Sequence, residues 1–245
     1  MASAESLRFC RVTNGVSNFY AVEQGGKVTL VDAGTPRDWT RLVSALETTG
    51  LGLDAVDCIL LTHAHSDHTG FSERARTEAG VAIWLHAADE EMARGGPAQS
   101  HEGSFRPHLL SWEAYHTAIG LGINRGSRIV PIAESRRFDD GETVDVPGRP
   151  RIVHVPGHTD GSCAVLFERP GWLATGDALV TLDPLSGERG PRLMPRALTH
   201  NTAQALESLP QLSATHARTV LPGHGEIYRD GVENAVRFAR AAASV

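Results

Sequence analysis

The chain contains 245 residues, of which 23 are basic and 29 acidic, so its formal net charge is −6. Hydrophobic residues make up 41% of the chain and charged residues 21%, which is typical of a folded protein and excludes a disordered one. The acidic balance argues against a nucleic-acid partner, and no apolar run approaches the roughly 20 residues that span a membrane.

The first third of the chain predicts short strands joined by tight turns. Residues 1–10 lack the basic and apolar regions of a secretory signal, so we expect a cytoplasmic protein. Period-two alternation predicts a first group of strands, and a continuous apolar run predicts a strand buried on both faces. Helical spacing of apolar residues predicts two helices, the first flanked by Pro36 and Gly50. The expected strands cover residues 7–12, 17–23, 27–31, 58–61 and 81–85, and the expected helices cover residues 36–46 and 71–79.

Residues 95–130 differ from the segments around them, because they are rich in Gly, Pro, Ser and His. One amphipathic stretch, residues 109–119, carries Trp112, Tyr115 and His116. An insertion of this kind is more often a lid or the wall of a substrate site than part of a core. We expect that role here, with Tyr115 and His116 as the substrate contacts.

Strand and helix patterns alternate again in the second half. The expected strands cover residues 142–146, 151–155, 163–167, 172–174 and 219–221, and the expected helices cover residues 201–212 and 231–243. The elements fall into two successive blocks, residues 1–130 and 131–245, and no linker separates them. The pattern predicts one compact domain over residues 1–245 with a layered α/β architecture.

The sequence HxHxDH follows the buried strand expected at residues 58–61. It places His63, His65, Asp67 and His68 within six residues, and packing does not explain this density, since each such group needs a partner when it is buried. In an extended loop His63 and His65 project to one side, and Asp67 and His68 turn to an adjacent position. This arrangement favours two neighbouring metal ions over one.

Three further loops offer ligand-type side chains, each just after an expected strand. His158 lies in GHTDG, Asp177 in TGD and His224 in PGHG. Each motif is weak alone, but side chains at strand ends converge on one edge of a sheet. Together with HxHxDH they predict a single metal centre.

These motifs, preceded by VDAG at residues 31–34, resemble the metallo-β-lactamase-fold hydrolase superfamily, in particular its dinuclear glyoxalase II-like and lactonase-like branch. The resemblance covers nearly the whole chain. It implies a four-layer αββα sandwich with the metal site at one edge of the two sheets, each half of the chain giving one sheet and its helices.

The same resemblance implies a set of metal ligands. It assigns His63, His65 and His158 to one metal, Asp67, His68 and His224 to the second, and Asp177 to a bridge between them. Asp32 is expected to orient a ligand near the site; the alternative is that Asp32 caps the helix at residues 36–46.

The expected cofactor is Zn²⁺, two ions per chain, with Fe as a second possibility, because imidazoles and carboxylates without a thiolate suit both metals. The three cysteines, Cys10, Cys58 and Cys163, form no CxxC pair, and we expect Cys58 and Cys163 to be core thiols.

The expected reaction is cleavage of an ester, thioester, lactone or amide by a metal-bridging hydroxide, with Asp67 orienting the nucleophile or taking its proton. The expected partner is a small-molecule substrate.

Differences between this sequence and individual branches of the superfamily narrow the range of expected reactions. Asp177 argues against antibiotic hydrolysis, since class B lactamases lack the bridging aspartate. Because 21 residues follow His224, we expect the glutathione-binding region of glyoxalase II to be missing and a glutathione thioester to be a doubtful substrate. The alternative function is that of a mononuclear iron persulfide dioxygenase using His63, His158 and Asp177, but Asp67 and His68 are retained. A binding module without catalysis would be expected to lack one of the metal ligands, and none of the expected ligands is missing from the sequence.

The remaining histidines receive no ligand role. His86 ends an expected strand and is either near the cleft or a satisfied buried histidine, and His154 is expected to point away from the site. Surface roles are expected for His101, His108, His200 and His216. Arg192 and Arg196 are possible partners of a substrate carboxylate, although surface arginines are the commoner case. Substrate identity and oligomeric state are not predicted.

Overall fold

The structure is a computed structural model, and it describes residues 6–108, 110–127 and 129–243. Leu109, where the expected amphipathic stretch begins, and both ends of the expected domain lie outside the described residues. The first block contains β1 (Arg8–Thr13), β2 (Asn18–Gln24), β3 (Lys27–Val31), α1 (Asp38–Glu47), β4 (Val56–Leu60), α2 (Ser72–Ala79), β5 (Ala82–His86), α3 (Glu90–Ala93) and α4 (Trp112–Ile123). The second contains β6 (Arg136–Phe138), β7 (Arg151–His154), β8 (Cys163–Phe167), β9 (Trp172–Gly176), β10 (Val180–Leu182), β11 (Arg189–Arg192), α5 (Thr202–Ser213), β12 (Thr219–Pro222) and α6 (Val232–Ala243).

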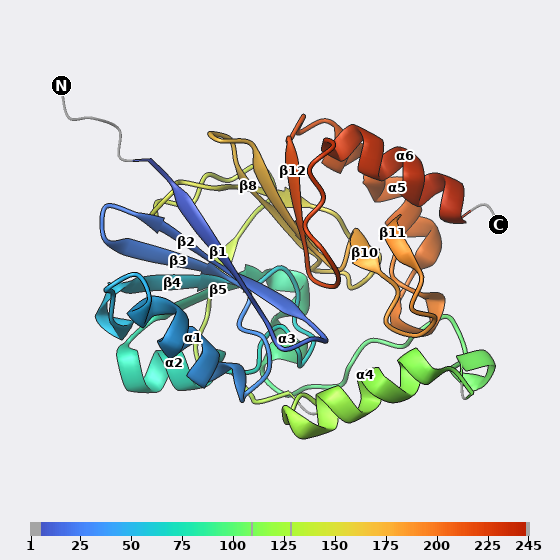
Figure 1. Ribbon diagram of the computed structural model, residues 1–245, viewed down its shortest axis with the longest axis horizontal. Coiled ribbons are helices and arrows are strands. Elements are labelled where there is room, and N and C mark those ends of the chain that lie inside the picture. The colour runs from blue at the N-terminus through green and yellow to red at the C-terminus, as the bar shows by residue number, and fades with distance from the viewer. Residues whose placement is uncertain (1–5, 109, 128, 244–245) are drawn as a thin grey trace.

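Two sheets form the centre of the molecule. The first has the order β1-β2-β3-β4-β5-β6, antiparallel from β1 to β3 and parallel from β3 to β6. The second has the order β12-β9-β8-β7, in which only the β12–β9 pair is parallel. Helices α1 and α2 lie on the outer side of the first sheet, and α5 and α6 on the outer side of the second (Figure 1).

Alternation along the strands divides the core into three apolar clusters. In β8, Val165 and Phe167 pack between the two sheets, whereas Ala164 and Leu166 face α5 and α6. The third cluster joins the first sheet to α1 and α2 and includes Leu42. Because strand side chains alternate between faces, each sheet is buried on both sides. Three clusters between four layers confirm the αββα sandwich.

Two details differ from the sequence prediction. Strand β6 pairs in parallel with β5, so the first sheet continues beyond residue 130 into what was expected to be the second block. The strand expected at residues 142–146 is reduced to a bridge between Thr143 and Arg151. The chain turns back directly after it, with the N–H of Val144 donating to the carbonyl of Pro150 and Arg149 at a φ of 41°, so no ladder extends.

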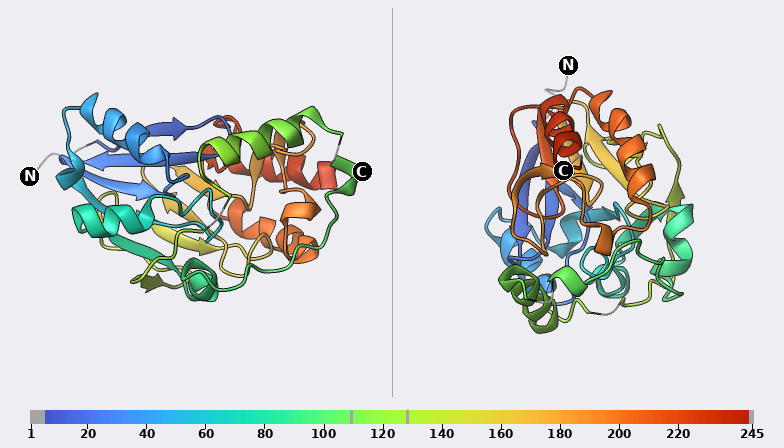
Figure 2. Two further views of the ribbon diagram at one scale, coloured as in Figure 1. Left: turned by 90° about the horizontal axis from the view of Figure 1, so that it is seen from below. Right: turned by 90° about the vertical axis from the view of Figure 1, so that its right-hand side faces the viewer.

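Helix α4 lies outside the four layers, beside the β10–β11 hairpin (Figures 1 and 2). The Ser111 hydroxyl bonds the Leu185 carbonyl, and the Thr117 hydroxyl donates to the Pro184 carbonyl at 2.8 Å. A Cβ at Gly120 would lie 2.4 Å from Cγ2 of Val16, so this glycine allows α4 to lie close to the loop between β1 and β2. None of the helices in the described part of the chain is both long and apolar enough to cross a membrane.

Candidate metal centre

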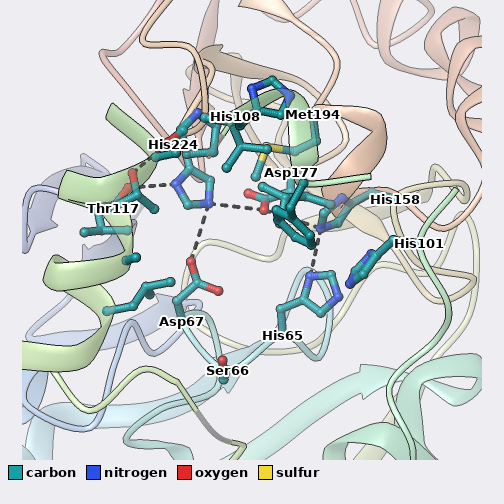
Figure 3. A pocket seen from close by; sticks show the side chains of 18 of the residues that line it. His65, Ser66, Asp67, His101, His108, Thr117, His158, Asp177, Met194 and His224 are labelled. Atoms are coloured by element: carbon teal, nitrogen blue, oxygen red, sulfur yellow. Dashed lines mark hydrogen bonds and ion pairs between the residues drawn. The ribbon is translucent and has the colours of Figure 1, made fainter. Parts of the chain in front are cut away.

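The expected ligands all follow strand ends, as the sequence predicts. His63, His65, Asp67 and His68 follow β4 of the first sheet, while His158, Asp177 and His224 follow β7, β9 and β12 of the second. The loops from both sheets meet at one edge of the sandwich. Figure 3 shows His65, Asp67, His158, Asp177 and His224 directed toward one another.

The donor atoms gather in two groups. One group consists of His63, His65, His158 and Asp177, and the other of Asp67, His68 and His224. Within each group the donor atoms lie within 4.8 Å of one another. The grouping is the same as the two sets of ligands expected from the sequence, with Asp177 placed in the first set. All of these residues are buried except His65 and Asp67, which are partly exposed.

The Asp177 carboxylate lies between the two groups. Its Oδ2 is 3.4 Å from Nε2 of His158 and 3.2 Å from Nε2 of His224, and its Oδ1 is 3.4 Å from Nε2 of His68. Asp67 Oδ2 is 3.5 Å from Nε2 of His224. A carboxylate within 3.4 Å of imidazole nitrogens from both groups is in the position required of a bridge.

Several of these donors are buried without a hydrogen-bond partner. The atoms are Nε2 of His63, His68 and His224 and Oδ1 of Asp177. A buried polar atom left unpaired costs about 1–3 kcal/mol, so a concentration of such atoms at one point requires an explanation. Divalent metal ions satisfy them, and the donor set of imidazoles and carboxylates suits Zn²⁺ and Fe.

The outward-facing nitrogens of two of the histidines, His68 and His224, are held by the protein. The Nδ1–H of His68 donates to Asp32 Oδ2 at 2.9 Å, and the Nδ1–H of His224 donates to the Val16 carbonyl at 2.7 Å. Such bonds fix the ring orientation and leave Nε2 directed at the centre.

Asp32 is placed beside the centre, not at the helix that follows. Its carboxylate accepts hydrogen bonds from the backbone N–H and the hydroxyl of Thr62 in addition to His68. It adopts a φ of 64°, a conformation rare outside glycine that persists only where surrounding bonds enforce it. The alternative role as a cap of α1 does not describe this position, because α1 begins at Asp38.

Burial and neighbouring charges shift the pKa values of the ligand histidines in opposite directions. Burial lowers the pKa of His65 to about 4 and lowers those of His63 and His158 well below their usual value, which keeps these imidazoles neutral. Burial also opposes charge on His68, but the carboxylates of Asp177, Asp67 and Asp32 outweigh it and raise its pKa to about 10. The imidazoles of the first group are thus in the neutral form that binds a metal ion, whereas the carboxylates around His68 favour its protonated form.

The glycine of the PGHG motif is required by the site. A Cβ at Gly223 would lie 2.3 Å from Oδ1 of Asp177 and 2.8 Å from Cε1 of His68. Any other residue there would displace one of these side chains. The glycines of the motif thus serve packing around the ligands as well as the turn.

Asp89 is a residue of the site that the sequence analysis missed. It is fully buried and accepts hydrogen bonds from the N–H of Ala64 at 2.9 Å, the N–H of Gly161 at 2.9 Å and the Thr159 hydroxyl at 2.8 Å. It therefore connects the HxHxDH loop to the loop of His158. No motif marks Asp89, because its partners are distant in sequence.

A cavity of about 510 Å³ opens above the donors. Its lining includes Tyr115, as expected, but also His101 and His108, for which surface roles were expected. His116 is not among the lining residues, because it is exposed on the side of α4 opposite Ala114 and Ala118.

Other candidates lie apart from the cavity. Arg196 lies 3.6 Å from Glu102, and Arg192 pairs with Glu188, so neither lines it. His86 stacks on His154 with ring centroids 4.2 Å apart. It is therefore neither a cleft residue nor a fully buried histidine.

The family model described as "Metallo-beta-lactamase superfamily" matches residues 12–224, a span that contains every expected ligand. The chain belongs to this superfamily. Its fold and its relatives make this metallo-beta-lactamase family member a metal-dependent hydrolase, as the motifs predict.

Three proteins illustrate the likeness. A hydroxyacylglutathione hydrolase from Cupriavidus taiwanensis is 30% identical over 225 residues, which cover 91% of this chain and 66% of that protein. The crystal structure of metallo-beta-lactamase family protein TTHA1429 from Thermus thermophilus is 30% identical with a TM-score of 0.67, covering 98% of this chain and 80% of that one. TTHA1623, solved in a di-iron-bound form, is 25% identical with a TM-score of 0.57, covering 92% of this chain and 96% of that one.

Proposed function

We propose that this metal-dependent hydrolase uses two metal ions to cleave an ester, thioester, lactone or amide of a small molecule. The observation that carries the proposal is the position of Asp177, whose carboxylate lies within 3.4 Å of imidazole nitrogens from both groups of donors. One metal would be held by His63, His65 and His158, the other by Asp67, His68 and His224, and both by Asp177. The unpaired donor atoms support this occupancy.

Zn²⁺ is the proposed metal, and Fe is the alternative. Histidine and carboxylate donors without a thiolate suit both, and the di-iron form of TTHA1623 supports the second. Bound metals in such a site supply Lewis acidity and a nucleophilic water at neutral pH.

The chain's own residues would position and deprotonate the nucleophile. Asp67 lines the cavity and is partly exposed, unlike the fully buried Asp177. Its carboxylate is thus accessible to a water that approaches the substrate, and we assign it the role of orienting that water and accepting its proton. The Asp32–His68 hydrogen bond would hold the neighbouring imidazole during this step.

Metal analysis tests the proposal. Protein purified without added metal should contain about two metal ions per chain, and chelation should abolish ester or lactone cleavage, with recovery when the metal is restored. Asp177→Ala should lose metal and activity together, whereas Asp145→Ala, at an exposed carboxylate, should lose neither. One iron per chain combined with oxygen uptake on a persulfide would overturn the proposal, as would full metal occupancy in Asp177→Ala.

A further inference from the structure

The cavity above the donors has walls of one chemical kind. Apart from the donors it is lined largely by apolar and aromatic side chains from the β1–β2 loop, α4, the segment before α4 and the β10–β11 region: Val16, Phe105, Ala114, Tyr115, Ala118, Leu121, Pro184, Leu185, Met194 and Leu198. At about 510 Å³ it lies within the range of small-molecule sites. The polar atoms it offers are concentrated at the metal donors.

Helix α4 supplies one wall by its inner face. Ala114, Thr117, Ala118 and Leu121 recur at helical spacing and line the cavity. The small side chains leave room beside the donors. The hydroxyl of Thr117 is already used, because it donates to the Pro184 carbonyl. The wall is therefore apolar in effect, and it is fixed to the hairpin by this bond.

Few polar side chains other than the donors line the cavity. The Ser66 hydroxyl donates to the Gly126 carbonyl at 2.6 Å. The remaining polar side chains are His101, whose ring lies 6.1 Å from that of His65 beside the donors, and His108.

No lysine or arginine is found among the described residues that line the cavity. Among the arginines close in sequence to its lining residues, Arg192 and Arg196 face Glu188 and Glu102, and Arg106 is exposed and lies outside the lining. A carboxylate on the substrate, apart from the carbonyl group that reacts, would thus lose its hydrating water without gaining a cation as partner, and it would approach Asp67. Burying an unpaired carboxylate is strongly unfavourable.

We propose that the substrate carries an uncharged, apolar acyl chain, which lies against the inner face of α4 and the β10–β11 hairpin. This inference rests on the proposed hydrolysis of a carbonyl compound. It excludes acyl groups that end in a carboxylate. The acyl chain of the substrate would be selected by burial of its methylene groups, and α4 would set the specificity.

Hydrolysis of p-nitrophenyl esters from acetate to decanoate tests the inference with the enzyme as purified. We expect kcat/KM to rise by about two- to fourfold per methylene until the cavity is filled. The glutarate monoester should react at least about 50-fold more slowly than the valerate ester, which has the same chain length. A flat profile, or a preference for glutarate, would overturn the inference.

Substitutions at one position of α4 sharpen the test. Ala118→Phe fills the inner wall, so it should reduce decanoate hydrolysis at least about tenfold more than it reduces acetate hydrolysis. Ala118→Arg supplies the missing cation and should raise the glutarate-to-valerate ratio by about tenfold. Ile119→Ala changes the exposed outer face of the same helix and should leave the profile unchanged. If Ala118→Phe lowers all esters equally, α4 is not the selective wall.

Binding of methyl ketones separates this inference from the proposed reaction, since a ketone has no leaving group. Calorimetry with 2-pentanone and 2-octanone should show tighter binding of the longer ketone in the unmodified protein and loss of that difference in Ala118→Phe. Absence of ester hydrolysis with this binding pattern would reject the proposed function but retain the apolar site. Equal affinities for the two ketones would reject the apolar site, whatever the hydrolytic activity.

Discussion

The Asp89 carboxylate accepts a hydrogen bond of 2.9 Å from the backbone N–H of Ala64, the residue between two of the expected ligands. The same side chain accepts from Gly161 and Thr159 in the loop of His158. It therefore fixes the relative position of two ligand loops that belong to different sheets. This makes Asp89 a positioning residue for the metal centre without contact to the metal itself.

Asp89→Asn should lower both stability and metal affinity. An amide leaves at least one of the three buried donors without its acceptor, which costs about 1–3 kcal/mol. Urea unfolding of the metal-loaded protein measures the first effect, and competition with a chromogenic chelator measures the second. Asp145→Asn, at an exposed site, is the control. A loss of stability with unchanged metal affinity would show that Asp89 supports the loops but not the centre.

Asp32→Asn should weaken metal binding by about 10- to 100-fold, as expected for the partner of a ligating histidine. Asparagine tolerates the positive φ of this position and retains one acceptor oxygen, so the backbone is conserved while the charge beside His68 is lost. Chelator competition against the unmodified protein measures the change. Asp32→Ala should be less stable in addition, because alanine disfavours this φ, and equal metal affinity in all three proteins would contradict the role assigned to Asp32.

Gly223→Ala should reduce metal occupancy sharply, since the added methyl group would lie 2.3 Å from Oδ1 of Asp177. Metal content per chain after purification is the measurement. Gly122→Ala is a matched control on α4, where a Cβ would meet no atom within 4 Å. Alanine is favoured over glycine in a helix by up to about 1 kcal/mol, so the control should be as stable as the original or more so. Normal metal content in Gly223→Ala would mean that the site accommodates the methyl group.

Thiol labelling should detect one cysteine in the folded protein and three after denaturation. Cys10 is exposed, whereas burial raises the pKa of Cys58 to about 12 and that of Cys163 well above its usual value. The thiolate is the reactive species, so both buried thiols are unreactive at pH 8. Mass spectrometry after treatment with iodoacetamide identifies the labelled residue. Rapid labelling of Cys58 or Cys163 would contradict the packing between the sheets.

The ligands of the candidate centre were predictable because their chemistry is local. Histidines and aspartates that directly follow buried apolar runs have few structural explanations, so HxHxDH and the three later motifs identify their own positions. The four layers followed from the resemblance that these motifs carry. Strand alternation then accounts for the three apolar clusters.

The features that were not predicted depend on contacts between distant segments. Asp89 acquires its role from Ala64 and Gly161, and β6 joins the first sheet because β5 offers it a parallel edge. The strand expected at residues 142–146 had a suitable composition but no continuous partner. His101 lines the cavity, and His116 does not, for reasons of helix orientation that composition does not contain.

The placement of the donors on both sheets has a consequence for folding. His63, His65, Asp67 and His68 are synthesised well before His224, which follows the last strand. The complete donor set therefore exists only after β12 has paired with β9 and the second sheet has docked on the first. Metal bound to all of these donors favours only this final arrangement and stabilises it by mass action, so loading with metal would report that the whole sandwich has assembled.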